Sequence, residues 1–138
     1  EQRKANKELF EKICMPLADR MEFIKPEQDV VTGITAVNGF GHSPGHMCYR
    51  IESDNKSLFF AADITNHFVV SMQVPDWHVM FDDNKEMAVE SRKRILSMLA
   101  TSKTPMIGYH MPFPAIGFVE KNKSLGYNWV PVSYQFSF

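Results

Sequence analysis

The stretch from residue 41 to residue 63, GHSPGHMCYRIESDNKSLFFAAD, restricts the possible folds of this chain more than any other segment. Residues 47–53 alternate apolar and polar side chains, as expected of a strand with one buried face. Residues 58–62 form a short continuous apolar run, which is typical of a fully buried strand, and DNKS between the two has the composition of a turn. The two strands should therefore form a hairpin, with Asp63 at the end of the second strand.

Helical patterns lie on both sides of this hairpin in the sequence. Residues 3–22 carry apolar residues at helical spacing, and Pro16 is expected to kink or end the first segment. Residues 84–102 give the strongest helix prediction, because Asn84 (or Asp83) can cap the N-terminus. The apolar residues expected on the inner face of this helix are Met87, Ile95, Met98 and Leu99.

Further strands are predicted at residues 29–37, with a Gly interruption, at residues 104–110 and in the aromatic tail from residue 127. The predicted class is therefore α/β (α+β), a mixed sheet with flanking helices, and residues 1–138 form a single domain. Cys14 and Cys48 lack metal-site spacing, and we expect both to be buried small hydrophobes rather than a disulfide or a nucleophile.

Charge and hydropathy exclude several classes of partner. The formal net charge of −1 gives no basic surface for nucleic acid, and no apolar run reaches the about 18 residues of a membrane span. The chain starts with Glu-Gln-Arg-Lys and not with methionine, so we expect an upstream part to be missing. The compartment, cytoplasmic or periplasmic, stays open for the same reason.

His42 and His46 are four residues apart, the spacing of the paired zinc ligands in a helical H-E-x-x-H motif. Gly41, Pro44 and Gly45 make a helix here very unfavourable, because proline and glycine cost about 3 and 1 kcal/mol in a helix interior. The two histidines therefore belong to a loop, and only one of them need face a metal.

Three polar residues stand next to apolar elements that would fix their backbones: His42 before a strand, Asp63 after LFFAA, and His110 after PMIGY. Imidazoles and a carboxylate at one sheet edge would suit zinc or a similar divalent ion. A single histidine of this kind is more often a satisfied surface or core residue. From spacing alone, the metal site and this simpler interpretation stay equally open.

The segments GHSPGHMCYRIES, LFFAADI and GYHMPFPAIG, in this order, resemble the second half of a metallo-β-lactamase-fold hydrolase. The stretch SMQVPDWHVMFDDNKEMAVESRKRIL is similar to the branch with methyl-parathion-hydrolase-like enzymes and N-acyl-homoserine lactonases, which are bacterial proteins. The resemblance implies the C-terminal half of an αβ/βα sandwich and two divalent metals, most simply zinc. It makes His42 a ligand of the first metal, Asp63 the bridging carboxylate and His110 a ligand of the second. His46 would be a hydrogen-bonded loop residue, and His67 a residue beside the ligands or the substrate pocket.

The family's H-x-H-x-D-H motif is absent, and no histidine precedes His42. We therefore expect the N-terminal half to be missing, no secure catalytic residue in this chain, and partial or no metal occupancy when the chain is alone. The complete protein would hydrolyse a small ester, lactone or phosphotriester with water activated by the metals. The missing half, or a second copy of the chain, would cover the exposed sheet face.

Two alternatives remain. The chain could be a non-catalytic remnant or interaction module of the same fold, or a small protein in which His42, Asp63 and His110 hold one ion.

Overall fold

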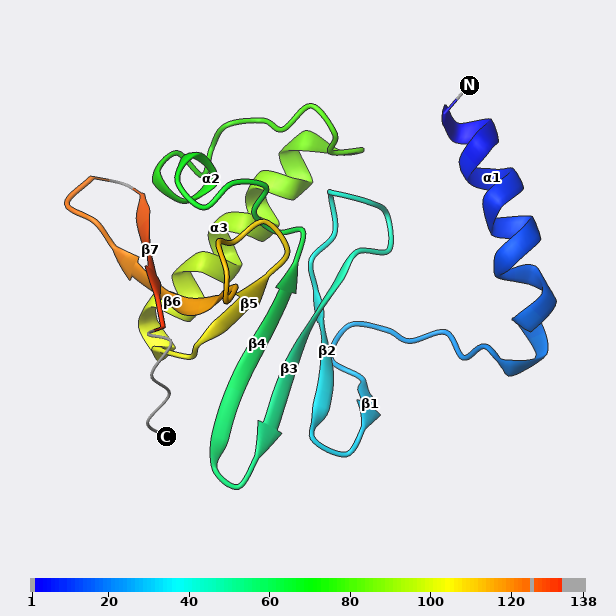
Figure 1. Cartoon of the computed structure of the whole chain (residues 1–138), viewed down its shortest axis with the longest axis horizontal. Coiled ribbons are helices and arrows are strands. Elements are labelled where there is room, and N and C mark those ends of the chain that lie inside the picture. Colours follow the sequence, from blue (N-terminus) through cyan, green and yellow to red (C-terminus); the bar gives the residue numbers. More distant parts are fainter. Residues whose placement is uncertain (1, 125, 133–138) are drawn as a thin grey trace.

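One mixed sheet of seven strands organises the chain, and the strands lie side by side in the order of the sequence (Figure 1). The computed structural model describes residues 2–124 and 126–132. The strands are β1 (Asp29–Val31), β2 (Ile34–Asn38), β3 (Met47–Ser53), β4 (Lys56–Ala62), β5 (Met106–Gly108), β6 (Ile116–Lys121) and β7 (Tyr127–Pro131). Every neighbouring pair is antiparallel except β4 and β5, which are parallel. The predicted α+β class with a mixed sheet is confirmed.

The predicted hairpin is formed by β3 and β4, with Tyr49 opposite Phe60. Its turn consists of Asp54 and Asn55 alone, and both have positive φ, 50° and 61°. Two-residue turns with positive φ match the right-handed twist of hairpin strands. Because the turn is this tight, β4 begins two residues earlier than predicted.

The sequence predicted two strands too few. Residues 29–37 form two antiparallel strands and not one, because the chain reverses at Gly33, which has φ +81°. A Cβ at this position would lie 2.6 Å from the Glu52 carbonyl oxygen, so only glycine fits the turn. The strand β6 was not predicted; it pairs with both β5 and β7. Of the β-like tail, β7 is seen and residues 133–138 lie outside the described residues.

The long helix α3 (Lys85–Ser102) packs on one face of the sheet (Figure 1). Its N-terminus is capped as predicted, since the Asn84 side chain accepts a hydrogen bond from the Met87 N–H at 3.0 Å. The predicted inner face was half wrong: Ile95 and Leu99 are buried, but Met87 and Met98 are exposed. The buried face also includes Ala88, Ser91, Arg92, Leu96 and Ala100. It is therefore centred on a buried arginine, which an apolar pattern does not reveal.

The other face of the sheet is less well covered. Apolar side chains there alternate with the buried ones of the core and stay only half-buried. A hollow on this face is lined mainly by Ile51, Leu58, Pro105, Ile116, Phe118 and Val132. This half-buried face is the surface on which the sequence led us to expect a partner, and the partner stays a prediction.

The N-terminal segment stands apart from the sheet (Figure 1). It consists of α1 (Gln2–Ile13) and a short 3-10 helix η1 (Met15–Arg20), with Pro16 at the start of η1, so the first helical segment ends where predicted. The apolar side chains of this segment are exposed, Ile13 by 57%. Cys14 is only half-buried, contrary to prediction, whereas Cys48 is buried; both are free thiols. No helix within the described ranges is long and apolar enough to span a membrane.

Candidate metal centre

Asp63 and His110 meet at one edge of the sheet. Asp63 directly follows β4, and His110 lies two residues after β5. Because these two strands are parallel neighbours, their C-terminal ends lie at the same edge. The Nε2 atom of His110 is 3.0 Å from Oδ1 of Asp63, and both side chains are partly exposed. The structure therefore brings together two of the three residues that the sequence singled out.

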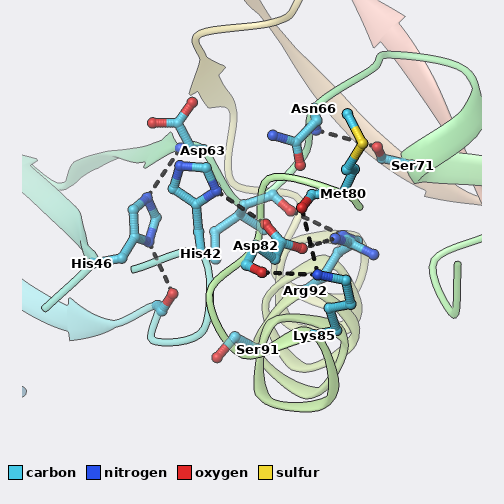
Figure 2. A network of polar contacts seen from close by, with 12 residues as sticks. His42, His46, Asp63, Asn66, Ser71, Met80, Asp82, Lys85, Ser91 and Arg92 are labelled. Carbon is cyan, nitrogen blue, oxygen red and sulfur yellow. Dashed lines mark hydrogen bonds and ion pairs between the residues drawn. The ribbon is translucent and has the colours of Figure 1, made fainter. Parts of the chain in front are cut away.

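The third residue, His42, has a different partner. Its Nδ1 atom lies 3.0 Å from Oδ1 of Asp82, whose side chain is 1% exposed (Figure 2). A carboxylate only accepts hydrogen bonds, so His42 donates from Nδ1. In neutral imidazole this leaves the lone pair on Nε2, and Nε2 makes no hydrogen bond with any described residue. His42 thus has the tautomer that can bind a metal through Nε2.

His46 lies between the loop and the end of β4, with both ring nitrogens hydrogen-bonded (Figure 2). Nδ1 donates to the Gly39 carbonyl at 2.9 Å, and Nε2 accepts from the Asp63 N–H at 3.1 Å. Burial lowers the pKa of His46, which favours the neutral ring that this pair of bonds requires. The geometry is that of a loop residue that fixes the backbone of Asp63.

Sequence reasoning missed Asp82 and Arg92, which lie behind His42. Arg92 of α3 is almost fully buried and donates to the carbonyl oxygens of Ile64, Pro75 and Trp77 at 2.8 to 3.0 Å. Its remaining nitrogen lies 3.4 Å from Oδ2 of Asp82. Burial lowers the Arg92 pKa, and the carboxylate opposes that effect. The one signal in the sequence for a buried Arg92 was its position, at helical spacing among the apolar residues of the helix.

His67 is an exposed residue at the start of the short helix α2 (Val70–Gln73). Its Nδ1 atom accepts hydrogen bonds from the N–H groups of Val69 and Val70 at 3.1 and 3.2 Å. The ring stacks on Phe68. These contacts give His67 a local role at the helix start, and its expected place beside the ligands or substrate stays a prediction.

Solved structures show what this arrangement is similar to. AidC, a dizinc quorum-quenching lactonase in complex with a product, aligns over 91% of this chain with a TM-score of 0.83 and 27% identity. The hydrolase AbOPH of the β-lactamase superfamily aligns over 88% with a TM-score of 0.79 and 26% identity. The chain has the metallo-β-lactamase fold. It corresponds to the C-terminal half of that fold and spans 42% of the length of each of these two proteins.

A third metallo-β-lactamase-fold structure supports the fold alone. It is an N-acyl homoserine lactone hydrolase with N-hexanoyl-L-homoserine bound at its catalytic metal centre. It aligns over 67% of this chain and 40% of its own, with 24% identity and a TM-score of 0.53. No protein-family model matches the sequence, and no curated protein matches it significantly.

The donor set fits part of a metallo-β-lactamase metal centre. Zinc binds imidazole nitrogen and carboxylate oxygen at about 2.0–2.2 Å, so two ligands on a tetrahedral ion lie roughly 3.3 Å apart. The 3.0 Å between His110 Nε2 and Asp63 Oδ1 is close to this separation. By the rule used for His42, Nε2 of His110 donates to the carboxylate, so an ion bound between the two atoms would have to replace that proton. Within residues 2–124 and 126–132, however, no three His, Cys, Asp or Glu side chains are grouped to hold one ion. The predicted ligands thus lie in two places, His42 in its loop and the Asp63–His110 pair at the sheet edge, and their binding of metal stays a prediction.

Proposed function

We propose that this chain supplies the C-terminal ligands of a dinuclear metal hydrolase that acts on a lactone, an ester or a phosphotriester. The observation that carries the proposal is the Asp63–His110 pair at the sheet edge, with His42 presenting a free Nε2 from the neighbouring loop. A lactone is the first candidate, because a dizinc lactonase shares the fold at 27% identity.

Each of the three residues has a defined part in this proposal. Asp63 and His110 would hold one ion, His42 would bind the other through Nε2, and Asp63 would be shared between the two. When bound, two zinc ions would supply an activated water and polarise the substrate carbonyl or phosphoryl group. His46 would keep Asp63 oriented through the backbone N–H of that residue. A catalytic zinc normally has three protein ligands, so further ligands must come from outside the described residues.

The half-exposed apolar face of the sheet is the surface through which we propose that a partner binds. Ile51, Leu58 and Phe118 line its hollow, and uncovered apolar surface of this kind favours association. An N-terminal half carrying H-x-H-x-D-H would cover this face and add the missing ligands. A second copy of the chain would cover it without adding those ligands.

The test compares the purified chain alone with the chain co-expressed with a segment that carries H-x-H-x-D-H. We expect the chain alone to hold well under one zinc by elemental analysis and to hydrolyse no lactone, aryl ester or phosphotriester. The combination should bind zinc and hydrolyse one of these classes. His110→Ala should abolish the hydrolysis, whereas His78→Ala, which changes an exposed histidine outside the site, should not. Hydrolysis that survives both His42→Ala and His110→Ala would refute the proposal.

A non-catalytic interaction module is the second candidate function. Two observations favour it: the lack of a three-ligand group in the described residues and the open apolar face. It predicts that the chain binds its partner, measured by sizing chromatography, equally well as wild type and as His42→Ala/His110→Ala. Zinc-dependent hydrolysis by the assembled pair would exclude it.

A further inference from the structure

We propose that Asp82 is a positioning residue for His42, holding its ring in the Nδ1–H tautomer so that Nε2 can bind the metal. The role of His42 as a ligand rests on the proposed function, but the hydrogen bond itself does not. Asp82 lies 40 positions after His42, in the irregular segment before α3, and the sequence analysis assigned it no role.

The contact is buried and specific. The Asp82 side chain is 1% exposed and that of His42 is 27% exposed, so the carboxylate side of the contact is closed to solvent. The Nδ1–Oδ1 distance of 3.0 Å is that of a normal hydrogen bond. The Nδ1 end of the His42 ring is therefore held by a buried carboxylate.

Neutralising the charge of Arg92 does not by itself explain why a carboxylate lies at position 82. The three carbonyl contacts of Arg92 are 2.8 to 3.0 Å long, whereas its contact with Asp82 measures 3.4 Å. The shorter hydrogen bond of Asp82 is the one to His42. Arg92 helps to orient the carboxylate in the interior, and the carboxylate in turn orients the imidazole.

The backbone holds the two partners in register. The N–H groups of Asp83 and Asn84 donate to the carbonyls of His42 and Gly41 at 3.2 and 2.9 Å. The hydroxyl of Ser91 in α3 donates to the Phe40 carbonyl at 2.7 Å. The loop that carries His42 is thereby attached to the start of α3, so the carboxylate and the ring meet without having to be ordered by the metal.

A metal-binding histidine commonly donates its other N–H to a carboxylate, which fixes the tautomer and makes the binding nitrogen more basic. Loss of such a partner typically weakens metal binding about 10–100-fold. The replacement Asp82→Asn keeps the size but changes the chemistry. The asparagine carbonyl is expected to face Arg92, a pure donor, which turns the amide NH2 toward His42. That NH2 would require an unprotonated Nδ1 and place the proton on Nε2, the wrong tautomer for a metal ligand.

The experiment is histidine-selective 15N–1H NMR of the metal-free chain at alkaline pH, for wild type, Asp82→Asn and Asp83→Asn. The five histidines are assigned with single His→Gln variants. Asp83→Asn is the matched control, because it removes one carboxylate at the next position, where only the backbone N–H contacts His42. We expect His42 to be Nδ1–H in wild type and in Asp83→Asn, and Nε2–H in Asp82→Asn. A zinc titration of the same three proteins, each combined with the H-x-H-x-D-H segment, should show about 10–100-fold weaker binding at His42 for Asp82→Asn only.

Each outcome decides a point. An Nε2–H tautomer of His42 in wild type, or an unchanged tautomer in Asp82→Asn, would overturn the role of Asp82. If Asp82→Asn does not fold, the wild-type tautomer still decides. If the tautomers are as expected but zinc leaves the His42 resonances of wild type unchanged, even with the H-x-H-x-D-H segment present, the positioning holds and the proposed function fails.

Discussion

Gly41 is the position where a single methyl group should disturb the candidate site most. It is buried, its φ is +126°, and it lies against the first turn of α3. A Cβ built on Gly41 would lie 2.1 Å from the Ala88 nitrogen and 2.4 Å from the Ala88 Cα. These are backbone atoms within a helix, which cannot move aside as the end of a flexible side chain can. Gly41→Ala must therefore move the whole loop away from α3.

The cost has two parts. A non-glycine residue at such a φ carries about 1–3 kcal/mol of strain, and forcing a methyl group into packed atoms costs about 1–3 kcal/mol more. Moving the loop would also break the hydrogen bond from the Asn84 N–H to the Gly41 carbonyl, and would separate His42 from Asp82. We expect Gly41→Ala to lower the free energy of unfolding by about 2–6 kcal/mol.

Urea unfolding followed by circular dichroism measures this loss, and the NMR signal of the His42 Nδ1–H reports on the site. Gly45→Ala is the matched control in the same loop, since a Cβ at Gly45 would meet no atom within 4 Å. Gly45→Ala should stay within about 0.5 kcal/mol of wild type. If Gly41→Ala is as stable as Gly45→Ala and keeps the His42 signal, the close packing of the loop on α3 is not what holds the site.

Three further predictions concern the buried Arg92 and the two cysteines. Arg92→Met leaves three carbonyls without their donor and the Asp82 carboxylate without its cation, so unfolding in urea should show a loss of about 3–5 kcal/mol; a loss under about 1 kcal/mol would contradict this reasoning. Burial raises the pKa of Cys48 from 9.0 to about 12. The unfolded thiol therefore ionises first, and wild-type stability should fall between these pH values relative to Cys48→Ala. Parallel pH dependence of the two proteins in urea unfolding would refute the shift. In alkylation at neutral pH, Cys14 should react at once and Cys48 only on unfolding.

The sequence was sufficient for the parts of the structure that depend on local pattern. The hairpin followed from alternation around DNKS, and the start of α3 followed from the capping residue Asn84. The meeting of Asp63 and His110 was predictable because each stands just after a buried strand. Parallel strands require a long crossover connection, usually a helix, and the helix predicted between these two strands could provide it.

What the sequence could not provide were contacts between distant polar side chains. Asp82 lies next to another aspartate in a segment without periodicity, and nothing in its neighbours points to His42. Arg92 occupies a position that helical spacing assigns to the buried face, where a charged residue argues against burial. Helical spacing of apolar residues also does not show where a helix packs: it predicted a helix over residues 3–22, yet Phe10 and Ile13 in α1 are exposed.

The contact between Asp82 and His42 and the pairing of Asp63 with His110 have a common origin in the topology. Parallel strands cannot be joined by a tight turn, so β4 and β5 require a crossover, and residues 63–105 provide it. The crossover brings the ends of β4 and β5 together, which creates the Asp63–His110 pair. It must also return across the sheet through α3, and the segment that leads into α3 passes the loop that carries His42. One connection thus creates the Asp63–His110 pair directly and places Asp82 beside His42, so changes in the crossover should affect both contacts.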